Sequence, residues 1–155
     1  MSFRLSTEAR SYFRQIEEKS TTGSFNTLWD QYYLSAMAGI KDRSRVSEDE
    51  EPSEEFMTDV IQDYQDQKYE IYSALIVAEV EREGIPWDEQ DEIREMMLKI
   101  LDSSSHTRLS DYGTTVLNCY GEKGFKLIRS EISTPPGLDE FLEQYHSLLE
   151  TLGED

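Results

Sequence analysis

The chain contains few of the residues that build disulfides or membrane spans. Its 155 residues include one cysteine, Cys119, so an internal disulfide is excluded and a reducing compartment is favoured. The longest apolar run, residues 74–78, has five residues, whereas a membrane helix needs about 20. Charges interrupt the N-terminal segment, which therefore lacks the apolar stretch of a signal peptide. We expect a cytoplasmic protein that makes no membrane contact.

Positive charge is also scarce. The chain has 15 basic residues against 33 acidic ones, which gives a formal net charge of −18. This balance excludes a generic basic nucleic-acid binder. Apolar residues make up only 37% of the chain, but two Trp, nine Tyr and six Phe supply bulk for a core. A chain of this length is expected to form one domain, since single domains hold about 100–200 residues.

The acidic residues are concentrated in the middle of the chain. Residues 1–45 carry a net charge of +2, residues 46–95 carry −15, and residues 96–155 carry −5. Such segregation favours either an acidic surface that faces a partner or a flexible acidic loop. A solvated face that keeps the protein soluble is the simpler interpretation.

Apolar residues recur at helical spacing, and strand signals are almost absent. Capping residues and helix breakers, including Gly121 and Gly124, predict helices at about 7–19, 25–38, 53–64, 69–82, 88–101, 110–120, 125–132 and 138–152. Residues 41–53 have Val46 as their only apolar residue and predict a mobile acidic loop. We therefore predict an all-α protein, a compact single-domain orthogonal bundle of six to eight helices spanning residues 1–155.

Two of the predicted helices have informative apolar faces. The 69–82 helix is apolar nearly all round, which is typical of a central helix, yet it carries Glu79 on an apolar face. A buried carboxylate is paired, hydrogen-bonded or protonated. We expect a structural pair with an Arg or Lys from the basic N-terminal region, and the alternative is a catalytic role. The 88–101 helix is predicted to direct five apolar side chains inward: Ile93, Met96, Met97, Ile100 and Leu101.

A possible metal site depends on whether the helix that begins near residue 53 is continuous. Asp59, Asp63, Asp66 and Glu70 would then lie within a stripe roughly 60° wide. Carboxylate oxygens are the ligands that Mg²⁺ prefers, so this stripe is compatible with a metal-dependent phosphohydrolase. A solvated or partner-facing acidic stripe is the favoured interpretation, and we expect no cofactor.

Other reactive residues give weaker signals. Glu143 and His146 have the Glu-x-x-His spacing of helical di-iron sites, but the second such pair is missing. Cys119 lies among apolar residues with no neighbouring His, which indicates a structural thiol and not a nucleophile. Neither pattern predicts a reaction.

The first 30 residues carry a family resemblance. Leu5-Ser6-x-Glu8-Ala9, then Thr22-Gly23, then Asn26-x-Leu28 resembles the opening of the small helical accessory protein of bacterial DNA phosphorothioation (sulfur-modification) systems. The resemblance implies an amphipathic helix, a Thr-Gly turn, a second helix and DNA binding through basic residues. The corresponding candidates here are Arg4, Arg10, Arg14, Lys19, Lys41, Arg43 and Arg45.

Together these patterns favour a non-enzymatic interaction or accessory subunit of a larger assembly, such as a DNA-modification or phage-defence complex. Tyr and Trp are enriched at protein interfaces, and the segregated charge suggests an acidic surface that faces a partner. The predicted partner-binding residues are Trp29, Tyr32, Tyr33, Glu48, Asp49, Glu50 and Glu51. The alternatives are the phosphohydrolase and a DNA-mimicking inhibitor whose acids would occupy a basic groove.

Overall fold

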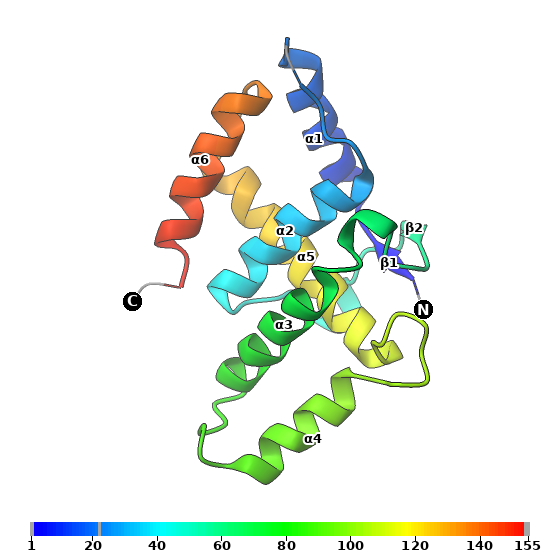
Figure 1. The fold of residues 1–155 in the computed structure, drawn as a ribbon. Coiled ribbons are helices and arrows are strands. Elements are labelled where there is room, and N and C mark those ends of the chain that lie inside the picture. The colour runs from blue at the N-terminus through cyan, green and yellow to red at the C-terminus, as the bar shows by residue number, and fades with distance from the viewer. Residues whose placement is uncertain (1, 22, 154–155) are drawn as a thin grey trace.

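Two long helices, α2 (Leu28–Asp42) and α5 (Asp111–Glu131), cross at the centre of the molecule and make its most extensive helix contact. The computed structural model describes residues 2–21 and 23–153, which form six α-helices and two short strands (Figure 1). The fold is 63% helical with a compact helix-packed core, so the predicted all-α bundle is confirmed.

Glycines allow α2 and α5 to approach closely. A Cβ on Gly124 would lie 1.6 Å from the Ser35 carbonyl oxygen, and one on Gly39 would lie 2.1 Å from the Tyr120 carbonyl oxygen. Only glycine leaves room for backbones at this separation. The prediction that Gly121 and Gly124 break a helix is therefore wrong, because both lie inside the continuous helix α5.

Helices α1 (Thr7–Lys19) and α6 (Leu138–Thr151) lie side by side at one end of the bundle (Figure 1). The Ser6 hydroxyl caps α1 by accepting a hydrogen bond from the Ala9 amide. The Tyr12 hydroxyl donates to the Ile132 carbonyl at 2.5 Å, which ties α1 to the end of α5. The predicted boundaries of these two outer helices are confirmed to within about one residue.

The segment predicted as a helix at 53–64 contains no α-helix. Strand β2 (Glu55–Met57) pairs antiparallel with β1 (Phe3–Arg4), and a single 3-10 turn, η2 (Gln62–Tyr64), follows. The Phe56 ring lies 5.3 Å from the Tyr32 ring. Pairing with the N-terminal strand and this aromatic contact override the local helical pattern.

Helices α3 (Lys68–Arg82) and α4 (Gln90–Ile100) form a helical hairpin at the opposite end of the bundle from α1 and α6 (Figure 1). Gly84, with a φ of 70°, lies in the connection and provides the left-handed conformation that follows α3. Within the described ranges, no helix is both long and apolar enough to cross a membrane.

The segment at 41–53, predicted to be a mobile exposed loop, packs along α5. The Val46 amide donates to the Cys119 carbonyl at 3.3 Å, and both Val46 and Pro52 are buried. The Arg45 side chain is only 7% exposed. The exposed-loop prediction is therefore wrong at these anchoring residues, although the short 3-10 turn η1 (Glu48–Glu50) does face solvent.

Candidate functional site

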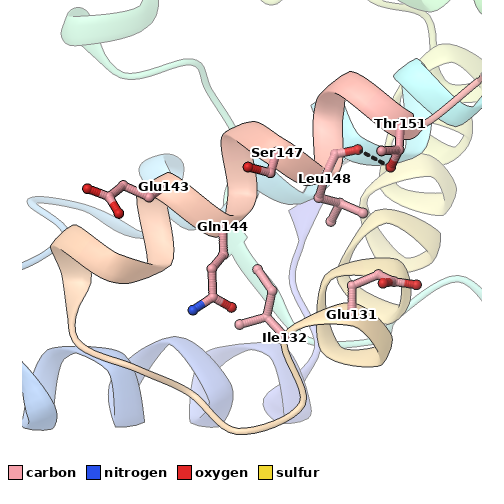
Figure 2. A pocket seen from close by; sticks show the side chains of 7 residues that line it. All are labelled: Glu131, Ile132, Glu143, Gln144, Ser147, Leu148 and Thr151. Atoms are coloured by element: carbon pink, nitrogen blue, oxygen red, sulfur yellow. Dashed lines mark hydrogen bonds between the residues drawn. The ribbon is translucent and has the colours of Figure 1, made fainter.

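A cavity of about 440 Å³ lies between the end of α5 and helix α6. Its lining residues are Glu131, Ile132, Glu143, Gln144, Ser147, Leu148 and Thr151. Figure 2 shows Glu131 and Glu143 on opposite sides of this cavity, and the Thr151 hydroxyl donates to the Leu148 carbonyl of its own helix. The lining offers neither a paired nucleophile and base nor converging carboxylates, so it does not form a catalytic arrangement.

The four predicted metal ligands do not share a helix. Asp59 precedes the turn η2, Asp63 lies within it, and Asp66 and Glu70 fall around the start of α3. All four side chains are exposed. Across residues 2–21 and 23–153, no group of three or more His, Cys, Asp or Glu is arranged to hold a metal ion. The prediction of a continuous carboxylate stripe, on which the phosphohydrolase hypothesis depended, is therefore wrong.

Neither Cys119 nor His146 lies in a reactive arrangement with other residues that the structure describes. Cys119 is buried, and burial raises the pKa of its thiol to about 12, so the thiol stays protonated at neutral pH. His146 lies on the exposed face of α6 with its Nε2 3.0 Å from Glu150 Oε1. The prediction of a structural thiol at Cys119 is consistent with this burial.

The predicted aromatic interface faces inward. Trp29 and Tyr32 are 3% and 1% exposed, and both rings pack edge-on against Phe3. Tyr33 is partly buried, with its ring 5.6 Å from that of Tyr64. Trp29 and Tyr32 therefore belong to the core, and the prediction that they form a partner-binding surface is corrected for these two residues.

The predicted acidic contacts divide into two groups. Glu48, Asp49 and Glu50 are exposed in η1. Glu51 turns inward, where it accepts hydrogen bonds from Asn118 Nδ2 at 2.9 Å and from Arg4 at 3.3 Å. Glu50 accepts a hydrogen bond from the Ser47 hydroxyl at 3.0 Å and lies 3.9 Å from Lys126 Nζ. Glu48 and Asp49 are therefore the more accessible acids, and Glu51 serves the internal packing.

Most of the basic candidates are engaged within the chain. Arg4 contacts Glu51 and Glu55, Arg43 contacts Glu81, and Arg45 contacts Glu79. Arg10 donates to backbone carbonyls of residues 5, 54 and 55. Lys19 Nζ donates to the Pro135 carbonyl, whereas Arg14 and Lys41 are exposed. Cations paired with carboxylates contribute little to phosphate binding, which weakens Arg4, Arg43 and Arg45 as phosphate contacts.

Glu79 has the pairing that its sequence position predicts. Its carboxylate is fully buried, and Oε1 lies 2.9 Å from Arg45 Nε and accepts a hydrogen bond from the Tyr120 hydroxyl at 2.7 Å. Burial by itself lowers the pKa of Arg45, but the hydrogen bond and charge of Glu79 raise it above its ordinary value. The predicted structural ion pair with the basic N-terminal region is confirmed.

Helix α4 presents the most exposed apolar surface among the described residues. Leu98 is 72% exposed and Met97 is 42% exposed, and Trp87, just before the helix, is 54% exposed. Leu98 and Met97 border a groove of about 390 Å³, which is also lined by Gln90, Ile93, Arg94 and Leu101. The prediction that Met97 faces inward is wrong, because only Met96 and Ile100 of α4 are buried.

The C-terminal half of α4 is firmly attached to α5. The Ser110 hydroxyl donates to the carbonyls of Lys99 and Ile100, at 2.6 Å and 3.0 Å. The Lys99 ammonium lies 4.2 Å from the centre of the Tyr112 ring. These contacts hold α4 in a fixed orientation, so its uncovered side is a preformed surface.

Acidic residues lie near this apolar groove, although the charged residue that lines it is Arg94. Residues 88–95 contain five acids against one base, Arg94, and all five acidic side chains are exposed: Asp88, Glu89, Asp91, Glu92 and Glu95. An exposed apolar patch with a polar rim is typical of a protein-interaction site. The helical spacing left Leu98 out of the inward set, but no sequence signal separated Met97 from the buried residues of the same helix, since all of them are apolar.

Comparison of the chain with protein-family models, with curated proteins and with solved structures finds no match. The resemblance of the N-terminal segment to the phosphorothioation accessory proteins stays a prediction. Thr22 of the Thr-Gly turn lies outside the described residues.

Proposed function

We propose that this protein is a non-enzymatic accessory subunit that docks to a larger protein through α4. The observation that supports the proposal is the groove bordered by Met97 and Leu98, where a side chain that is 72% exposed would be buried by a partner. Burying apolar surface in an interface favours binding by about 25 cal/mol of free energy per Å². A rigid helix with an uncovered apolar side provides this contribution at a small ordering cost.

The N-terminal resemblance suggests which assemblies to examine first. A DNA-modification or phage-defence complex contains large proteins that act on DNA, and an accessory subunit of such a complex would attach to one of them. Direct DNA contact is not part of the proposal, because Arg4, Arg43 and Arg45 are paired with carboxylates of the same chain.

The DNA-mimic alternative has less support. A mimic needs acids that project together from one face, whereas Glu51 and Glu79 are turned inward to internal partners. Glu48, Asp49 and Glu50 are exposed, but they form one short turn. Acidic residues near an apolar groove are better suited to steering a protein partner than to imitating a DNA duplex.

The test is affinity purification of the full chain from its native cells at low salt, in parallel with the variants Leu98→Ser and Leu142→Ser. Leu142 is a matched control because it lies on α6 and is 43% exposed, so its substitution also removes an exposed leucine. We expect one stoichiometric larger protein with the wild type and with Leu142→Ser, and its loss with Leu98→Ser.

Recovery of the protein alone would overturn the proposal. Equal recovery of the partner with both variants would show that docking does not use α4. Circular dichroism of each variant confirms folding, which both should retain because the two leucines are exposed.

A further inference from the structure

Helix α4 carries apolar residues beyond those that the rest of the chain covers. At about 100° per residue, its apolar positions run over an arc of about 100° from Met96 through Ile100 and Ile93 to Met97, and Leu98 lies about 100° further round, beyond Gln90 and Arg94. Helices α3 and α5 cover the part that contains Met96 and Ile100, so Met97 and Leu98 are left uncovered.

The chemistry of this uncovered side favours a helical occupant. The groove runs between Gln90 and Leu101, which is the full length of the helix, with Ile93, Met97 and Leu98 along it. Apolar side chains at such spacing match the anchors of an amphipathic helix laid into a groove. Methionine adapts its shape to different partners, which suits Met97 to an interface.

The charges near the groove determine which net charge a bound partner should carry. Residues 88–95 carry five exposed acids against one base, Arg94, which lines the groove, and the whole chain carries −18. A second copy of this chain, or a nucleic acid, would bring like charge against these acids. An occupant with Lys or Arg beside its apolar residues would instead gain attraction from Asp91 and Glu95, which lie next to Leu98 on the side of α4 away from Met97.

We infer that the groove of α4 binds a basic amphipathic helix of a partner protein, with Met97 and Leu98 contacting its apolar residues and Asp91 and Glu95 its cations. The inference rests on the proposed function, because it names the part of the larger protein that α4 recognises.

The experiment is a selection with the intact protein from a displayed library of helical peptides. The library contains basic, neutral and acidic sequences, each with its apolar residues either on one face or scattered. We expect enrichment of basic peptides with one apolar face. Leu98→Ser should weaken binding of a selected peptide about tenfold, and Leu142→Ser should leave it unchanged.

A variant with fewer acids separates the charge attraction of the peptide from its apolar contacts with α4. Asp91→Asn combined with Glu95→Gln should weaken binding of the basic peptide and reduce its dependence on salt. The matched control, Glu140→Gln combined with Glu143→Gln, removes two exposed acids from α6 instead. Equal effects of the two pairs would show nonspecific charge attraction and overturn the inference.

The outcomes distinguish this inference from the proposed function. Enrichment of acidic, neutral or scattered sequences, or of no peptide at all, overturns the inference. If the purification from native cells still recovers a partner that depends on Leu98, the proposed function stands and only the class of partner is wrong. If Leu98 affects neither experiment, both fail.

Discussion

At the scale of single residues, the buried ion pair of Glu79 is the contact whose loss should be most damaging. Its carboxylate is fully buried between Arg45 and Tyr120. Neutralising it leaves the Arg45 guanidinium buried without a counter-ion, which costs about 3–5 kcal/mol. We expect Glu79→Gln to lower the free energy of unfolding by about 3 kcal/mol in a urea titration.

The neighbouring exposed pair provides the control. Glu81 contacts Arg43 near the same end of α3, but both side chains are partly solvated. Glu81→Gln should change the free energy of unfolding by at most about 1 kcal/mol, because exposed pairs contribute little. Similar losses for Glu79→Gln and Glu81→Gln would contradict the structural role assigned to Glu79.

Cys119 should be almost inert in the folded protein. Its thiol pKa is raised to about 12 by burial, whereas a free cysteine has a pKa of about 8.5. At pH 8 the reactive thiolate is then on the order of 10³-fold less abundant in the folded chain than in the unfolded chain. We expect slow labelling by a thiol reagent in native buffer and rapid labelling in urea. Rapid labelling in native buffer would contradict the burial of this side chain.

At the scale of the elements, the crossing of α2 and α5 depends on one particular glycine. A Cβ at Gly124 would overlap the Ser35 carbonyl oxygen, at 1.6 Å, whereas a Cβ at Gly121 would lie 3.7 Å from the Tyr32 ring. Gly124→Ala should therefore destabilise the protein by about 3 kcal/mol through overpacking. Gly121→Ala should stabilise it by about 0.5–1 kcal/mol, because alanine favours the helix.

Thermal unfolding of the two variants measures this difference directly. Both substitutions add one methyl group to the same helix, so any effect of helix propensity is shared between them. Opposite signs are expected. Equal gains in the melting temperature would show that the backbones of α2 and α5 are not in close contact at Gly124.

At the scale of the whole molecule, unbalanced charge should limit stability at low salt. A net charge of −18 repels itself in the folded state, and salt screens this repulsion. We expect the melting temperature to rise between low salt and about 1 M NaCl, where the Debye length is about 3 Å. Replacing Glu48 and Asp49 by their amides should raise the melting temperature at low salt and reduce the increase. A melting temperature that does not respond to salt would contradict this prediction.

The acidic middle of the chain combines two different environments. Glu51 and Glu79 are internal and hold the N-terminal segment and the 41–53 segment against the bundle. The acids of η1 and those beside the α4 groove face solvent. The charge segregation seen in the sequence is therefore partly structural and partly a feature of the surface that we propose for docking.

The sequence by itself determined the all-α class, the approximate positions of most helices, and the need for a cation beside Glu79. Apolar periodicity, capping residues and the cost of burying a lone charge are local or pairwise effects, so they can be inferred without a fold. Only the tertiary structure decided that Gly124 lies inside a continuous helix, because its role depends on a backbone from another part of the chain. It also decided that Trp29 and Tyr32 pack inward, that residues 55–57 pair with the N-terminal strand, and that Met97 and Leu98 stay uncovered. The sequence does not distinguish a buried apolar residue from an exposed one. The packing of the neighbouring elements decides whether such a residue is covered.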